Sequence, residues 1–485
     1  MKVLFAIPRL KSMYGDYEGA TGHPHVGIAY LTSWLKKNGV EVAIFDDGIQ
    51  FSDAKLLEAI RVERPDLIGV TMFSYCYQSG YDMIQLIKEN CDIPLVVGGP
   101  HVSGTRKQIL EETDADFAVK HEGEKTLLAL LNAIREKRSD FSDIDGLLWV
   151  SKSGEVIENK DRPFLTSEEL EDLPFPDYEA FGIERYKCVD FKTLPLLTSR
   201  GCPYGCNYCS VRLSHGRGFR FRTAQNVFEE IEYWFNKGWR HFEINDDCFT
   251  THVPRAEEIC DLIISSGLGI TFSLYNGIRV DSVNISLLKK MKEAGCIFLT
   301  FGCESGNNYI LKEIGKGITK NQVLQASKWC QDLGIPHSIN FIVGHTGETY
   351  GTALDSLLFA ESLPCAFVNF YNLVPYPGTD AYTWVKKNGR FLVAEEDYLK
   401  YVSYRDNRPI FETDDFSEAE RKKITKMGFN LYEKKTLVFR LGPNLGYMAY
   451  FLTRVPLIHR IALMVFQSRL GGKLYSMLSN KSKES

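Results

Sequence analysis

Cysteine is concentrated in the segment TSRGCPYGCNYCS, residues 198–210. Cys202, Cys206 and Cys209 are separated by three and then two residues, and glycine and proline lie around them. Thiolates are the preferred ligands of soft metal ions and iron–sulfur clusters. Glycine and proline oppose a regular helix, so this segment can wrap around a compact object. The spacing therefore predicts a metal centre held by a loop.

Two kinds of metal centre and one metal-free arrangement are alternatives for this loop. Structural zinc takes four protein ligands, and His215 is the nearest candidate for the fourth. Iron–sulfur clusters normally take four cysteines, so a cubane held by three has one iron open to a substrate or cofactor. Three buried thiols without metal are the remaining alternative, which the close spacing disfavours. The pattern favours the iron–sulfur cluster.

The first 140 residues alternate between apolar and amphipathic segments. Strands are expected at residues 2–7, 40–46, 66–73, 93–99 and 115–121. Helices are expected at residues 26–38, 52–64, 81–90, 106–112 and 124–137, the second of them capped by Ser52 or Asp53. Apolar strands separated by amphipathic helices predict a doubly wound parallel sheet, with ligands beyond the carboxyl ends of its strands.

A hairpin is expected at residues 147–157, and the acidic, proline-containing residues 158–195 read as a connector. From Leu194 a second alternation begins. Its expected strands are residues 194–199, 241–246, 270–276, 297–302, 337–344 and 367–374, with helical patterns such as residues 223–237 and 321–334 between them. Such repeated units predict a partial (β/α) barrel. The cysteines follow its first strand and are therefore expected at the barrel mouth.

The cysteine triplet, with Tyr208 just before its last member, resembles the signature of the radical S-adenosylmethionine (SAM) superfamily. The resemblance extends over roughly residues 195–385. It is carried by HFEINDDCFT (241–250), YNGIRVD (275–281), FGCESG (301–306), FIVGHTGET (341–349) and VPYPGT (374–379). One departure is His345-Thr346, where members of the superfamily often have a proline.

This resemblance implies that Cys202, Cys206 and Cys209 hold a [4Fe–4S] cluster whose open iron chelates SAM. Reduction of the cluster then cleaves SAM to methionine and a deoxyadenosyl radical, which removes hydrogen from an unactivated carbon. It also implies a SAM site shaped by Tyr208, Asp246, Asn276, Arg279 and Glu304.

The first domain has no GxGxxG motif, which argues against a dinucleotide. Its fourth expected strand instead ends in VVGGPHVSG (96–104), where paired glycines permit a tight turn or close approach to a bulky ligand. Together with residues 23–46, 66–74 and 119–127, this segment resembles the cobalamin-binding domain that precedes some radical SAM barrels. The matching positions are Pro24, Gly27, Thr71, Ser74, Gly98, Gly99, His101, Ser103, Glu122, Gly123 and Glu124.

Many cobalamin proteins carry an Asp-x-His-x-x-Gly motif whose histidine ligates cobalt, and this chain has none. His23, His25, His101 and His121 lie in the first domain without that spacing. Cobalamin is therefore expected without an assigned lower ligand, and a domain that has lost cobalamin is the alternative.

Composition bounds the remaining expectations. The net charge of −5 and the absence of a separate RNA-binding module argue against a nucleic-acid partner. Scattered cysteines indicate a reducing cytoplasm. The apolar N-terminal stretch is too short for a signal peptide, and no apolar run of about 18 residues predicts a membrane span.

The C-terminal tail has a distinct composition. Residues 434–483 contain no acidic residue and nine Lys and Arg, interleaved with apolar stretches. This composition fits contact with an anionic membrane at the inner face, and helices that cap the barrel are the alternative. Membrane contact would favour a lipid or isoprenoid-type substrate.

The sequence thus predicts an α/β chain in four parts, residues 1–140, 141–193, 194–390 and a helical 391–485. We expect a cobalamin-dependent radical SAM enzyme, a methyltransferase acting on an unactivated carbon of a small-molecule or lipid substrate. A radical cyclase with the same cofactors and a non-catalytic iron–sulfur or zinc protein are the alternatives. The family resemblance also implies a flavodoxin or ferredoxin as electron donor.

Overall fold

A computed structural model describes residues 1–9, 11–12, 15–16, 22–402 and 407–454. Its first sheet has the strand order β4-β1-β5-β6-β7-β8-β9, and the first five of these strands are parallel. The strands are β1 (Lys2–Ile7), β4 (Glu41–Asp46), β5 (Leu67–Thr71), β6 (Leu95–Gly98), β7 (Phe117–Val119), β8 (Leu147–Val150) and β9 (Val156–Glu158). The doubly wound sheet expected from the sequence is confirmed.

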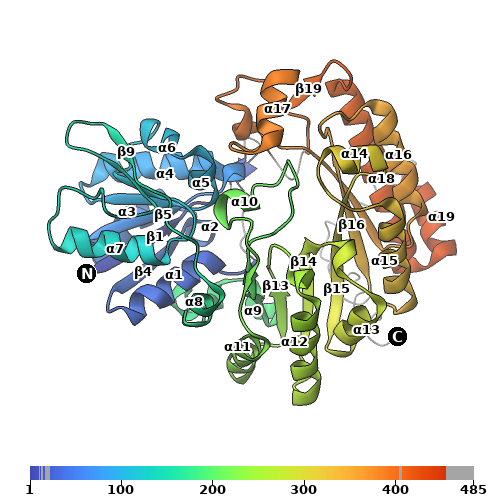
Figure 1. Cartoon of the computed structure of the whole chain (residues 1–485), viewed down its shortest axis with the longest axis horizontal. Helices are drawn as coiled ribbons and strands as arrows, with labels where there is room; N and C mark the ends of the chain where they lie inside the picture. The colour runs from blue at the N-terminus through green and yellow to red at the C-terminus, as the bar shows by residue number, and fades with distance from the viewer. Residues whose placement is uncertain (10, 13–14, 17–21, 403–406, 455–485) are drawn as a thin grey trace.

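Helices pack on both faces of this sheet (Figure 1). They are α1 (Val26–Lys37), α2 (Asp47–Gln50), α3 (Asp53–Glu63), α4 (Tyr77–Asn90), α5 (Pro100–Thr105), α6 (Gln108–Glu111) and α7 (Glu124–Arg135). Ser52 caps α3 by accepting a hydrogen bond from the Lys55 backbone N–H, as the sequence indicated. The expected hairpin forms β8 and β9, and it joins this sheet antiparallel, so the sheet extends beyond residue 140.

The connector holds α8 (Ser167–Glu171) and α9 (Cys188–Phe191) and leads into a second sheet. All six strands of that sheet are parallel, in the order β10-β13-β14-β15-β16-β17. They are β10 (Thr193–Leu196), β13 (His241–Ile244), β14 (Thr271–Ile278), β15 (Cys296–Glu304), β16 (His337–Val343) and β17 (Phe367–Asn372). This sheet is the expected partial barrel.

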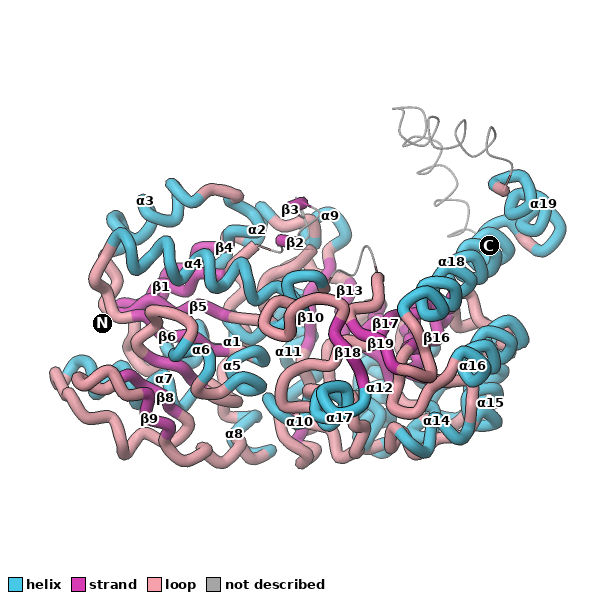
Figure 2. Tube along the Cα trace, turned by 90° about the horizontal axis from the view of Figure 1, so that it is seen from above, coloured by secondary structure: helices cyan, strands magenta, loops and turns pink. Residues whose placement is uncertain are grey.

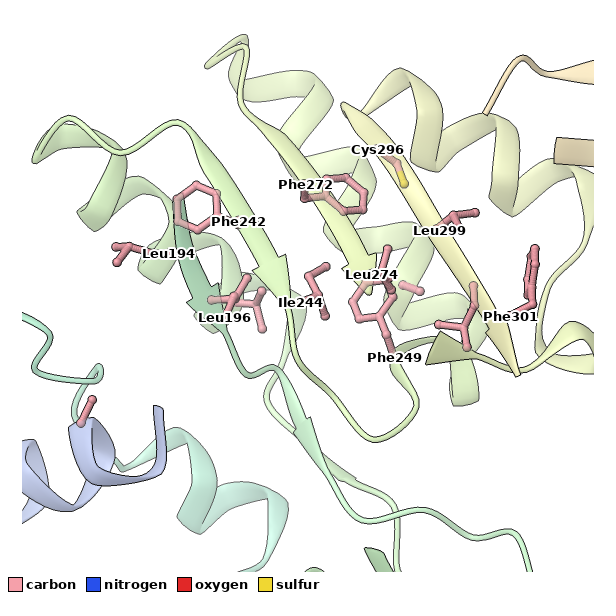
Figure 3. Packing of buried hydrophobic residues seen from close by; sticks show 14 of the residues in the cluster. Leu194, Leu196, Phe242, Ile244, Phe249, Phe272, Leu274, Cys296, Leu299 and Phe301 are labelled. Carbon is pink, nitrogen blue, oxygen red and sulfur yellow. The ribbon is translucent and has the colours of Figure 1, made fainter. Parts of the chain in front are cut away.

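The helices outside the second sheet are α11 (Ala224–Asn236), α12 (Val253–Ser266), α13 (Ile285–Glu293), α14 (Asn308–Glu313), α15 (Lys320–Asp332) and α16 (Tyr350–Ser362). Alternate apolar side chains of neighbouring strands, such as Phe242, Phe272 and Leu299, interdigitate in the core beneath them (Figure 3). Burial of such side chains fixes the register of the strands, and the register fixes which residues emerge at the mouth.

The chain after the barrel first returns to the N-terminal domain. It forms α17 (Asp380–Asn388), β18 (Gly389–Phe391) and β19 (Phe411–Thr413). Apolar side chains of residues 373–402 and 407–411, here called the closing segment, share one buried cluster with the first sheet. Tyr398 and Phe411 of this segment are buried in that cluster with Leu4 of β1.

Two C-terminal helices follow, α18 (Glu418–Leu441) and α19 (Pro443–Thr453). Arg421 of α18 lies against Gly344, at the carboxyl end of β16. Lys435 donates to the carbonyl oxygen of Leu363, before the amino end of β17 (2.6 Å). Helix α18 therefore runs antiparallel to the barrel strands and carries α19 away from the mouth, where it projects from the body (Figure 2). Within the described residues, no helix is both long and apolar enough to cross a bilayer.

Candidate functional site at the barrel mouth

The cysteine loop runs from β11 (Ser199–Arg200) to α10 (Val211–Ser214), at the carboxyl end of β10. Gly201 begins it with φ +86°, and a Cβ at this position would lie 2.2 Å from the carbonyl oxygen of Gly218. Asn207 donates through its backbone N–H to the carbonyl oxygen of Ile314 and accepts through its own carbonyl from the N–H of Ala381, both at 3.0 Å. The loop backbone is thus fastened to the barrel and to the closing segment.

The three thiols of this loop are half-buried and form no disulfide. Burial, together with the charge of neighbouring Cys206, raises the pKa of Cys202 to about 11 and that of Cys209 to about 12. Cys202 and Cys209 are therefore protonated at neutral pH until a cationic centre displaces the protons. Three thiols within reach of each other's charge, on a loop of small residues, fit an iron–sulfur cluster with three protein ligands.

His215, the fourth ligand of the alternative zinc site, is paired with a carboxylate. His215 Nδ1 lies 2.8 Å from Asp247 Oδ2. Asp247 also accepts from the backbone N–H of Gly201 (2.8 Å).

Glu304, expected at the SAM site, ends β15 in a left-handed conformation with φ +72°. Lys316 donates through Nζ to Glu304 Oε1 (2.9 Å) and to the Tyr208 hydroxyl (3.4 Å). Burial opposes the Lys316 charge, but the Glu304 carboxylate outweighs it and raises the Lys316 pKa. Glu304, Tyr208 and Lys316 thus form one buried polar group beside the cysteine loop.

Lys316 was not predicted as a site residue. It lies between Gly315 and Gly317, which both have positive φ, in the turn between α14 and α15. The Gly-Lys-Gly pattern is the signal that could have identified it. Two glycines with positive φ form a tight turn, and such a turn fixes the direction of the lysine side chain between them.

Arg279 and Asn276 lie at the mouth near β14, as expected. Arg279 forms a bidentate pair with Asp281 (2.9 and 2.8 Å) and lies over the Tyr204 ring at 3.6 Å. Asn276 donates to the backbone carbonyl of Asn245 (3.1 Å). Tyr204 belongs to the cysteine loop, so Arg279 connects that loop to the third strand of the barrel.

Asp246 is buried, and its oxygens accept from the Thr198 backbone N–H (2.6 Å), the Thr198 hydroxyl (2.5 Å) and the Ser199 hydroxyl (2.5 Å). Asp246 thus fixes Thr198 and Ser199, the residues that lead into the cysteine loop. The next residue, Asp247, lines the open cavity instead.

His345, part of the departure from the superfamily pattern, lies in the turn after β16. It is 1% exposed, and its ring lies 5.2 Å from that of Tyr208. Neither ring nitrogen has a hydrogen-bond partner among the described residues. Burial lowers the pKa of His345 to about 3, so the ring is neutral.

A cavity of about 300 Å³ lies between the first sheet and the barrel mouth. Its first-domain wall includes seven positions that match the cobalamin-binding pattern: Gly27, Thr71, Gly98, Gly99, Glu122, Gly123 and Glu124. Its barrel wall includes Arg200, Ser214, His215, Asn245, Asp247 and Asn276. The carboxyl ends of both sheets therefore face one shared space.

Four predicted positions, Pro24, Ser74, His101 and Ser103, do not line this cavity. His101 is buried, and its Nδ1 lies 3.1 Å from the Ser74 hydroxyl. Ser103 accepts from the backbone N–H of His121 (2.9 Å). These residues hold the loops that form the wall.

The cavity offers backbone surface to a bulky ring. Gly98 has open space on its cavity side, where a Cβ would meet only the Val119 carbonyl oxygen at 3.9 Å. A Cβ at Gly99 would lie 2.6 Å from the Met72 carbonyl oxygen, and φ is +109° there, so the turn requires glycine. These glycines, here called the cobalamin cradle, fit the corrin ring of cobalamin, because they let a flat ring approach the backbone beyond β6.

Buried ion pairs join the two walls. Arg200 Nη2 lies 2.7 Å from Glu124 Oε1, and its Nη1 lies 3.2 Å from Glu122 Oε1. Arg220 also donates to Glu122 (2.7 Å), and these two arginines lower the Glu122 pKa against the effect of burial. Glu122 and Glu124, expected at the cobalamin site, therefore also bind Arg200, which directly precedes the cysteine loop.

Gly201→Ala is expected to displace the cysteine loop, because φ +86° and the 2.2 Å approach both exclude a side chain. Iron bound after anaerobic reconstitution should fall to less than half of the wild-type amount. Gly205→Ala serves as the matched control, since a Cβ there meets nothing within 4 Å. Equal iron in the two variants would contradict the expectation.

Comparison with known proteins agrees with this site. The profile of the Radical SAM superfamily matches residues 196–360, and that of the B12 binding domain matches residues 19–131. An uncharacterized methyltransferase of Pyrococcus horikoshii is 30% identical, over 88% of this chain and 92% of that protein. An anaerobic magnesium-protoporphyrin IX monomethyl ester cyclase of Rubrivivax gelatinosus is 28% identical, over 79% and 69%.

Among solved structures, the radical SAM methyltransferase TsrM of Kitasatospora setae, with cobalamin and a [4Fe–4S] cluster bound, has the same fold. Its TM-score is 0.71 at 17% identity, with coverage of 95% of this chain and 98% of that chain. The chain belongs to the radical SAM enzymes that carry a cobalamin-binding domain. Its cofactors are a [4Fe–4S] cluster, SAM and cobalamin.

Proposed function

We propose that the chain is a cobalamin-dependent radical SAM methyltransferase that methylates an unactivated carbon of a small molecule. The observation that supports this proposal is the shared cavity, whose wall contains the glycines after β6 and the residues Arg200, Ser214 and His215 that flank the cysteine loop. When bound, the cluster and SAM supply a radical that removes hydrogen, and cobalamin supplies the methyl group.

The residues of the chain bind and orient these groups. We propose that Cys202, Cys206 and Cys209 hold the cluster. The Glu304–Lys316 pair presents one acceptor and one cation, which complement the ammonium and carboxylate groups of SAM. The glycines beyond β6 receive cobalamin, and the Arg200 ion pairs keep the two sites in register. The electron donor that we propose is a low-potential flavodoxin or ferredoxin.

Radical cyclisation is the second candidate, and the identity to the Rubrivivax cyclase favours it. The product mass separates the two reactions, because methylation adds one methyl group and cyclisation adds no carbon. The test is anaerobic reconstitution, reduction, and mass analysis of candidate substrates incubated with methyl-labelled SAM. Labelled carbon in the product supports methylation. An unlabelled product with hydrogen transferred to deoxyadenosine would show cyclisation instead.

We also propose that the C-terminal helices contact an anionic membrane from the cytoplasmic side. Large exposed apolar side chains gather on α18 and α19, namely Phe429, Phe439, Leu441, Leu445, Met448, Phe451 and Leu452. Residues 434–454, within the acid-free tail, provide four Lys and Arg next to them. The remaining basic part of the tail, residues 455–485, lies outside the described residues.

This geometry bears on the lipid substrate inferred from the tail. Helix α19 lies toward the amino ends of the barrel strands, whereas the cysteine loop lies at their carboxyl ends. A membrane that contacts α19 therefore does not face the mouth. We propose anchoring as the role of this contact and retain a lipid or isoprenoid only as a substrate class for the mass assay.

Replacing both Met448 and Phe451 by glutamate is expected to weaken vesicle binding at least about tenfold, since each buried apolar side chain contributes about 1.5–3 kcal/mol. Flotation with phosphatidylserine-containing vesicles measures the loss. Val62→Glu is the matched control, because Val62 is 69% exposed on α3 of the first domain. Wild-type protein that fails to float with these vesicles would exclude the contact.

A further inference from the structure

A second cavity lies at the opposite end of the barrel strands from the cysteine loop. It has a volume of about 490 Å³ and is bordered by His337, the first residue of β16, and by Ala366, the residue before β17. The side chains of α18 that line it are Leu431, Lys434, Lys435, Val438 and Phe439. We propose that this space, here called the basal cavity, binds one anionic phospholipid, with Lys435 contacting the phosphate. The choice of a lipid rests on the membrane contact proposed above and on no step of the methyl transfer.

Most of the wall of the basal cavity is apolar. The turn before β16 contributes Ile335 and Pro336, and the turn before β17 contributes Leu363 and Pro364. The volume lies within the range of small-ligand sites, which measure roughly 300–1,000 Å³. The wall can therefore hold part of an acyl chain away from water.

The apolar wall continues onto the exposed surface of the C-terminal helices. Phe439 of α18 is 50% exposed and Tyr447 of α19 is 44% exposed, and both line the basal cavity. Met448, one of the exposed residues that we place at the membrane, directly follows Tyr447 in the chain. The basal cavity therefore lies beside the surface proposed to contact the bilayer.

Lys435 has no counter-charge beside it. Its Nζ donates to the Leu363 carbonyl oxygen (2.6 Å), and among the described residues no carboxylate lies within 4 Å of it, whereas the neighbouring Lys434 pairs with Glu361. Burial outweighs the attraction of the Glu361 carboxylate and lowers the pKa of Lys435. An ammonium group has three donor hydrogens, so Lys435 retains two for an anion. A phosphate can accept a charge-assisted hydrogen bond from each of them.

The other titratable groups that line the basal cavity do not compensate for this charge. Glu361 is neutralised by Lys434, which lies 2.8 Å from it. His337 is neutral, because burial lowers its pKa to about 4. The Cys330 and Cys365 thiols are also neutral, because burial raises their pKa values to about 12 and about 11. One surplus positive charge therefore remains, which matches the single negative charge of a phosphodiester.

Charge and apolar area together decide between the lipid and two other occupants. Residues 455–483, which follow α19 in the chain, contain five Lys and Arg and no acidic residue, so the positive charge of the cavity disfavours this tail. Inorganic phosphate would pair with Lys435 but would leave the apolar wall in contact with water. An anionic phospholipid satisfies both the ammonium group and the apolar wall.

The first test is isothermal titration of the full chain, reconstituted with its cofactors, with dihexanoyl phosphatidylglycerol below its critical micelle concentration. Dihexanoyl phosphatidylcholine and inorganic phosphate are the comparison ligands. Phosphatidylglycerol is expected to bind at least about tenfold more tightly than either, because it alone combines a net negative charge with acyl chains. Equal affinity for the two lipids, or for phosphatidylglycerol and phosphate, overturns the proposal.

The second test assigns the binding to Lys435. Lys435→Met retains an unbranched side chain and removes the charge, so the preference for phosphatidylglycerol should disappear. Lys422→Met is the matched control and should keep the preference, because Lys422 lies near the start of α18, where its 56% exposed side chain pairs with Glu418. Iron and cobalt contents serve as folding controls for both variants. A preference that persists in Lys435→Met at wild-type iron and cobalt contents contradicts the site.

These measurements separate the basal cavity from the membrane contact. Wild-type protein that shows the expected lipid preference but fails to float with vesicles supports the cavity and excludes the contact. Wild-type protein that floats without any preference in the titration supports the contact and excludes the cavity as a lipid site. Absence of a methylated product changes neither result.

Discussion

Cys206→Ala protein, purified and reconstituted without oxygen, is expected to lose its iron–sulfur cluster and all reductive cleavage of SAM. Cys206 is one of three thiols on a loop that is hydrogen-bonded to the barrel. No cysteine outside this triplet has the spacing to serve as the third ligand. Loss of one ligand from three leaves a cluster with two protein ligands, which the loop cannot retain. Iron and sulfide assays and deoxyadenosine formation measure the effect.

Cobalt binding by the same variant should stay at the wild-type level, because the cobalamin cradle is formed by the first domain. Cys330→Ala is the matched control, since Cys330 is a buried thiol on α15 outside the loop. It should retain iron and SAM cleavage. Full iron in Cys206→Ala, or zinc in place of iron in reconstituted wild type, would refute the assignment.

Arg200→Met is expected to destabilise the chain by about 3 kcal/mol, because it leaves Glu124 buried without its cation. Cobalamin affinity should fall at least about tenfold, since Glu122, Gly123 and Glu124 form one wall of the shared cavity. Chemical denaturation of the loaded protein and titration with hydroxocobalamin measure the two effects.

The partner substitution sharpens this prediction. Arg200→Met combined with Glu124→Met should cost less than the sum of the two single substitutions, because the pair is removed together. Arg138→Met is the control, since Arg138 pairs with Asp143 at the surface, where solvent screens the pair and its contribution to stability is small. Additive costs in the double variant would mean that the two residues are not coupled.

Local patterns were sufficient to predict the cysteine loop, both sheets and the glycines of the first-domain wall. The thiol spacing is a local feature, and Gly98 and Gly99 follow an apolar strand directly. Features that depend on tertiary structure, such as side-chain direction and strand pairing, could not be predicted from local patterns. Neighbouring aspartates of one loop face opposite directions, so the pattern selected Asp246 while Asp247 reaches the cavity. The pairing of β8 with β7 depends on an unpaired sheet edge, which no local pattern reports.

Residues that act across long sequence distances were also missed. Nothing in the sequence indicated that Arg200 forms buried ion pairs, because its partners Glu122 and Glu124 belong to another domain. From the sequence, His215 was considered only as a fourth zinc ligand. Its partner Asp247 lies after β13 and is distant in the sequence. Composition indicated the basic, apolar tail but not the direction of α18, which separates α19 from the mouth.

The closing segment also determines how the two halves of the molecule can move. Its side chains, among them Tyr398 and Phe411, share one apolar core with β1, although they follow the barrel in the chain. Hinged separation of the two halves would expose that core to water, at a cost that rises with every apolar side chain uncovered. The two walls of the shared cavity should therefore keep their spacing when cobalamin binds or leaves.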